Sequence, residues 1–147
     1  MAERYDRCEA LHSEAMQHAN DGMAQRYLGE IDAAVATFRK AWELERTAAM
    51  ELIGEALEPS RSILFRSAAS LALLCGEIED ARRLAHLGLA GTPDRHVRQS
   101  LQGILSDADA RARAGAVVVA SVTEEIRQLR PNDDPPEPID VTWKHSA

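Results

Sequence analysis

Gly29-Glu30-Ile31-Asp32-Ala33-Ala34 recurs 47 residues later in the chain as Gly76-Glu77-Ile78-Glu79-Asp80-Ala81. Each copy stands between two stretches in which apolar residues recur with helical spacing, so its glycine ends one helix and the next helix follows. The two copies therefore predict two related helical hairpins. Stacked helical hairpins typically bind partners rather than catalyse reactions, which makes an all-α interaction protein the first expectation.

Apolar residues at three- and four-residue steps predict the first hairpin. Its first helix covers residues 3–28, and its second covers residues 31–57 before Glu58-Pro59 stops it. Two helices of similar length joined by a short turn can bury their apolar faces along their whole extent. The apolar face of the first helix consists of Cys8, Leu11, Ala15, Ala19, Met23 and Tyr27.

The second hairpin follows the proline. Ser60 or Ser62 is expected to cap a third helix that ends at Gly76. A fourth helix is predicted over residues 78–90, where the next glycine stops it. The first four predicted helices thus form two antiparallel hairpins.

The chain beyond the second hairpin is less regular. A fifth helix is predicted to begin near Asp94, and Gly115 leaves its end open. Residues 116–120 fit either a strand followed by a short capped helix or a continuation of the fifth helix. The continuation is favoured because apolar residues keep the helical spacing, namely Val118 or Val119, Val122, Ile126 and Leu129. The total is five or six helices.

The C-terminal tail differs in composition from the rest of the chain. Residues 131–138 hold four prolines and three acidic residues, which predicts an extended acidic linker. Beyond the linker, apolar and polar residues alternate as far as Trp143, as in a short strand or docking segment. Trp143 is a candidate partner-binding residue, which docks either on this chain or on another protein. We expect a helical domain over residues 1–130 and a tail over residues 131–147.

Composition and charge restrict the class of partner. Hydrophobic residues make up 45% of the chain but aromatic residues only 4%, a mixture that favours close-packed helices. The formal net charge of −7 disfavours nucleic acids and anionic membrane surfaces as partners. No apolar run approaches the roughly 20 residues that span a bilayer. The expected partner is therefore a protein, with no nucleic acid and no membrane involved.

The cysteines and the first residues indicate the compartment. Cys8 and Cys75 lie far apart without disulfide-like spacing, which predicts buried free thiols in a reducing environment. The charged start of the chain lacks the apolar stretch of a secretory signal. A cytoplasmic location is expected. Lysine accounts for only two of the 17 basic residues, which is typical of a GC-rich bacterial genome.

The sequence offers no convincing chemistry. Cys8 and His12 are four residues apart on one helix face, a spacing that can supply two metal ligands, but no second pair accompanies them. No serine or cysteine is grouped with a histidine and an acid in the way that a nucleophile requires. We expect no enzyme activity, no metal and no cofactor.

The two copies and the residues that follow them resemble the second half of a tetratricopeptide repeat (TPR). The residues that carry this resemblance are Phe38, Ala41, Trp42 and Leu44 after the first copy, and Ala85, Gly88, Leu89 and Pro93 after the second. In the TPR family a small residue lies midway along the first helix of each pair, where the two helices approach closely. Gly22, Ala69 and Gly103 stand at those places, so the fifth helix resembles the start of a third repeat.

The resemblance covers approximately residues 10–110 and implies a bacterial protein with TPR-like antiparallel helical hairpins. Two features depart from the family. TPR repeats recur every 34 residues, whereas the two copies here are 47 residues apart, which predicts an elongated first hairpin. His18 and Asp21 also replace the aromatic residue and the leucine of the family signature. A general bundle of helical hairpins is the alternative.

The resemblance also implies a binding face, because TPR proteins bind ligands on the concave surface of the first helices. The partner-binding residues that it implies are Asn20, Met23, Arg26 and Tyr27 of the first helix, and Arg66, Ser67 and Ser70 of the third. The same face would also hold Met16, Ala19, Ile63 and Leu74. A guanidinium beside an amide and hydroxyls can bind a peptide carboxylate or backbone. The alternative is that Arg26 and Arg66 are ordinary solvated residues that pair with nearby acids.

The expected function is a non-enzymatic adaptor or scaffold that binds a protein or peptide on this face. The alternative is a structural subunit that self-associates into a homo-oligomer. Residues 117–129 would supply the apolar seam between the copies in that case.

Overall fold

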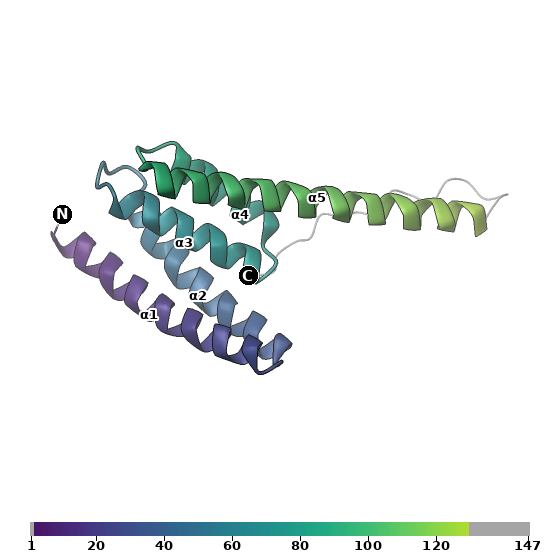
Figure 1. The fold of residues 1–147 in the computed structure, drawn as a ribbon, viewed down its shortest axis with the longest axis horizontal. Coiled ribbons are helices and arrows are strands. Elements are labelled where there is room, and N and C mark those ends of the chain that lie inside the picture. Colours follow the sequence, from purple (N-terminus) through teal and green to yellow (C-terminus); the bar gives the residue numbers. More distant parts are fainter. Residues whose placement is uncertain (1, 130–147) are drawn as a thin grey trace. The chain divides into compact units, whose positions relative to one another are not determined.

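The computed structural model describes residues 2–129, which form five α-helices and no strand (Figure 1). The predicted all-α class is therefore confirmed for this part of the chain. The predictions for the proline-rich tail, including Trp143, lie outside the described residues. The five helices are α1 (Ala2–Tyr27), α2 (Ile31–Glu51), α3 (Ser60–Leu74), α4 (Ile78–Leu89) and α5 (Arg95–Leu129).

The chain divides into two compact units, Met1–Ala112 and a second unit that begins at Arg113. The first unit holds α1 to α4 and the first part of α5. Within it, α1 packs against α2, α2 against α3, and α3 against α4, so that neighbours in sequence are neighbours in space (Figure 1). The helical hairpins predicted from the repeated motif are thus present.

The two repeated glycines end their helices in the same way. Gly29 and Gly76 adopt φ angles of 79° and 82°, in the left-handed region that favours glycine. The N–H of the residue after each glycine donates to a carbonyl five residues back, at 2.9 Å for Glu30 and 2.8 Å for Glu77. Each glycine N–H donates to the carbonyl three residues back. Both turns are therefore Schellman motifs, which explains why the glycine recurs in the sequence.

The second copy of the motif also joins the two hairpins. Asp80 accepts a hydrogen bond from the indole Nε1 of Trp42 at 2.8 Å and forms an ion pair with Arg46 at 3.2 Å. Arg39 forms an ion pair with Glu77 at 2.5 Å. These three donors all lie on α2. The acidic residues of the motif therefore hold the start of α4 against α2.

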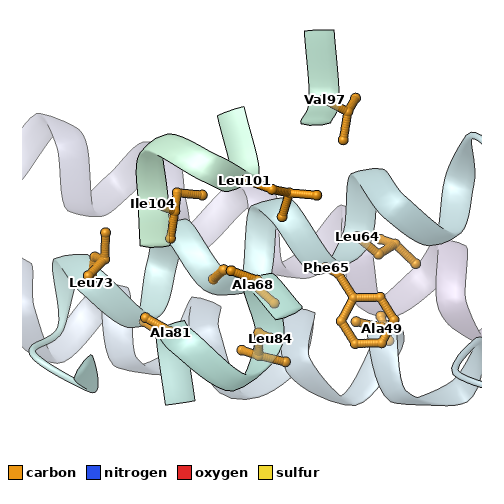
Figure 2. Close-up of a cluster of buried hydrophobic side chains, with 14 of the residues drawn as sticks. Ala49, Leu64, Phe65, Ala68, Leu73, Ala81, Leu84, Val97, Leu101 and Ile104 are labelled. Carbon is orange, nitrogen blue, oxygen red and sulfur yellow. The ribbon is translucent and has the colours of Figure 1, made fainter. Parts of the chain in front are cut away.

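All five helices contribute to the main core of the first unit. Phe65, Leu84 and Leu101 are fully buried, and Figure 2 shows side chains of α3, α4 and α5 meeting in this core. A smaller cluster surrounds Phe38 of α2. A Cβ atom at Gly22 of α1 would lie only 2.7 Å from the ring of Phe38, so the close approach predicted at Gly22 is confirmed.

Two predicted details of the helix ends are wrong. The second helix ends at Glu51 rather than at residue 57, because the N–H groups of Leu52 and Ile53 bond three residues back in a tighter turn, and a glycine follows. The third helix begins at Ser60, but no serine caps it. The carboxylate of Glu58 instead accepts the Ser62 N–H at 3.2 Å and its hydroxyl at 2.7 Å.

The fifth helix runs without a break from Arg95 to Leu129. It begins close to Asp94 as expected, and the Asp94 carboxylate accepts the N–H of Val97 at 2.9 Å. Residues 116–120 are helical, so the strand alternative is excluded. Among the described residues, no helix combines the length and apolar character that a membrane span requires.

Candidate functional site

A cavity of about 290 Å³ opens on the first unit between alternate helices. It is the strongest candidate site because helices α1, α3 and α5 each contribute to its lining. The lining residues are Met16 and Ala19 of α1, Arg66, Ser67, Ser70 and Leu71 of α3, and Ser100 of α5. Apolar and polar side chains therefore meet in one depression.

The register of the repeat explains how three helices supply this lining. Counting back three residues from Gly22, Ala69 and Gly103 gives Ala19, Arg66 and Ser100, and all three line the cavity. Sequence reasoning missed Ser100, although this register was the signal that could have found it. The surroundings of Gly103 are open, because an added Cβ atom there would meet nothing within 4 Å.

Arg66 differs from the other half-buried arginines among residues 2–129. Arg39, Arg46 and Arg82 each form an ion pair with a carboxylate, at 2.5, 3.2 and 3.0 Å. Arg66 has no ion pair and no side-chain hydrogen bond within the described residues. The interpretation of Arg66 as a residue that pairs with a nearby acid therefore finds no support in this part of the chain.

A buried carboxylate of α2 interacts with Ser67 of the cavity lining. Glu45 of α2 is fully buried, and Nδ1 of His12 lies 2.8 and 3.0 Å from its two carboxylate oxygens. Burial raises the pKa of Glu45, although the charge of His12 and hydrogen bonds with His12 and Ser67 act in the opposite direction. Ser67 thereby connects Glu45 to the cavity wall.

Sequence reasoning missed Glu45. It occupies a position on the buried face of α2, in the same three- and four-residue series as Ala41 and Ala48. An acidic residue within such an apolar series was the signal that could have indicated a buried carboxylate. His12, which the sequence offered as a metal ligand beside Cys8, pairs with Glu45 instead. No group of three or more metal-ligating side chains occurs among the described residues.

The structure brings together only part of the predicted binding face. Arg66, Ser67 and Ser70 of α3 line the cavity. Met16 and Ala19, which the resemblance also placed on this face, line it from α1. The other candidates on α1 do not line it and are exposed on the C-terminal half of that helix; they are Asn20, Met23, Arg26 and Tyr27. The remaining candidate, Trp143, lies outside the described residues.

The second unit presents a different kind of surface. Along its part of α5, Val117 and Val118 are 65% and 62% exposed. Val119 and Val122 are 43% and 45% exposed. These four side chains form an apolar surface on the helix that carries the predicted seam.

Comparisons with known proteins do not extend this description. No protein-family model, no curated protein and no solved structure matches the chain. The resemblance to TPR proteins therefore remains an expectation that depends on the residues of this chain alone.

Proposed function

We propose that this protein is a non-enzymatic adaptor or scaffold, a short TPR-like stack that binds a protein or peptide where α1, α3 and α5 meet. The observation that carries this proposal is the cavity lined by these three helices, in which the half-buried Arg66 has no acidic partner among the described residues. Arginine is enriched among the residues that dominate binding energy at protein interfaces.

The lining suits a peptide in two further respects. Met16, Ala19 and Leu71 provide an apolar surface, whereas the serines provide hydroxyl groups that can donate or accept hydrogen bonds. Binding sites typically combine a mostly apolar wall with a few polar groups that fix the orientation of the ligand. A cytoplasmic location in a bacterium belongs to the same proposal.

The substitution Ser70→Trp tests the location of the site. Ser70 is exposed and lines the cavity, so a bulky indole there should fill the depression with little effect on the core. We expect tagged wild-type protein to capture a partner from a lysate of its source organism, and Ser70→Trp to lose it. Recovery should be quantified by mass spectrometry.

Arg83→Trp is the matched control, because Arg83 is an exposed residue of α4 that does not line the cavity. This variant should capture the same partner as the wild type. Equal recovery by Ser70→Trp, with an unchanged circular dichroism spectrum, would remove the cavity from the proposed function.

Self-association is the second candidate function, and the exposed valines of the second unit favour it. Apolar residues repeated along one helix can form a seam between two copies. If this seam operates, light scattering should show a dimer or larger species that Val118→Asp with Ile126→Asp converts to a monomer. A wild-type protein that stays monomeric at high concentration would exclude this candidate.

A further inference from the structure

The cavity has the features of a site for a single negatively charged group. We propose that it binds one oxyanion, a carboxylate or phosphate carried by a side chain of the partner peptide, with Arg66 as the principal contact. This inference rests on the proposed function, because the peptide would bring the oxyanion to the cavity. It specifies the chemistry that the partner must present.

The state of Arg66 is the first argument. A guanidinium carries five N–H donors and no acceptor, and its planar fork matches the oxygens of a carboxylate or phosphate. The other three half-buried arginines among residues 2–129 already contact a carboxylate of the chain, whereas Arg66 does not. Its donors are therefore available to a ligand.

The hydroxyl groups are the second argument. Ser70 of α3 and Ser100 of α5 line the cavity with Arg66, so hydroxyls from two helices border the same space. Hydroxyl and guanidinium donors together are well suited to the several oxygens of one anion. Ser67 contributes less, because its side chain interacts with Glu45.

The size and charge of the surroundings define the ligand further. A cavity of about 290 Å³ lies just below the range for small-molecule sites, roughly 300–1,000 Å³, and suits one side chain. The net charge of −7 opposes the approach of a polyanion, so a single oxyanion on a neutral or basic partner is favoured.

An NMR titration of the isotope-labelled full chain tests the proposal with three capped amino acids. The probes are N-acetyl-glutamate amide, N-acetyl-phosphoserine amide and the neutral N-acetyl-glutamine amide. We expect at least one acidic probe to shift the amide signals of Ser67, Ser70 and Ser100, and the neutral probe to leave them unchanged. The acidic probe that binds identifies the source of the oxyanion as a carboxylate or a phosphate.

Arg66→Gln keeps much of the side-chain stem and removes the charge. It should therefore raise the dissociation constant of the acidic probe at least about tenfold. Arg83→Gln on α4 is the control for the loss of one exposed positive charge and should bind as the wild type does. The proposal is overturned if no acidic probe shifts these signals, if the glutamine probe shifts them equally, or if Arg66→Gln binds unchanged.

These results can be separated from the test of the proposed function. If Ser70→Trp abolishes capture while Arg66→Gln preserves it and no acidic probe binds, the oxyanion is wrong and the binding face stands. If Ser70→Trp captures the partner normally, the proposed function fails whatever the probes show.

Discussion

Phe65→Ala is expected to lower the free energy of unfolding by about 3–5 kcal/mol, because it removes a large side chain from a close-packed core. Phe65 is fully buried in the core cluster of the first unit, where its Cβ atom would lie only 3.1 Å from a Cβ atom added at Gly88. Small domains are stable by only about 5–15 kcal/mol, so this loss is a large fraction of the total. Urea unfolding followed by circular dichroism measures it.

Tyr27→Ala is the matched control for this prediction. Tyr27 is an aromatic residue at the last position of α1, but 90% of its surface is exposed. Its removal should change the free energy of unfolding by no more than about 0.5 kcal/mol. A loss below roughly 1 kcal/mol for Phe65→Ala, or equal losses for the two variants, would contradict the described core.

Gly22→Ala and Gly103→Ala are expected to change stability in opposite directions, although both replace a glycine within a helix. At Gly22 the new Cβ atom would lie 2.7 Å from two ring carbons of Phe38, so helix α1 or the ring must shift at a cost of about 1–3 kcal/mol. At Gly103 the new atom meets nothing within 4 Å. Alanine should therefore stabilise α5 there by up to about 1 kcal/mol.

Thermal unfolding of the two variants beside the wild type measures this difference. The midpoint should fall for Gly22→Ala and stay equal or rise for Gly103→Ala. Destabilisation by Gly103→Ala comparable to that by Gly22→Ala would contradict this prediction. It would then conflict with the open surroundings of Gly103 in α5.

Local features of the fold were predictable from the sequence. Gly29 and Gly76 end their helices as expected, because a left-handed residue is a local requirement that glycine meets best. The helical spacing also indicated the continuation of α5 through residues 116–120. The end of α2 was not predictable in the same way, because the apolar spacing continues past the tight turn that ends the helix. The start of α3 was not predictable either, because Glu58 and the nearby serines are all able to bond its first N–H groups.

The α3 part of the candidate site was the most predictable. Arg66, Ser67 and Ser70 lie within two turns of α3 and reach the cavity together. The resemblance to TPR proteins placed Tyr27 with them, but α1 buries only a narrow series, Cys8, Ala15 and Gly22, at seven-residue steps. A helix at the end of the stack packs mainly against one neighbour, so much of a broader apolar face remains exposed.

Contacts between distant residues account for what the sequence did not reveal. His12 and Glu45 are 33 residues apart and belong to different helices, so their pairing depends on how α1 packs against α2. Ser100 reaches the cavity because the first part of α5 belongs to the same unit as α3. Such pairings follow from tertiary packing, which no local period encodes.

The central claim is that a protein partner binds the cavity face of the first unit, and an NMR footprint of that partner on the labelled chain tests it most directly. With a captured partner added, we expect the largest shifts of amide signals at Ala19, Ser70 and Ser100, which line the cavity on three helices. Shifts confined to residues 117–129, with these three signals unchanged, would contradict it.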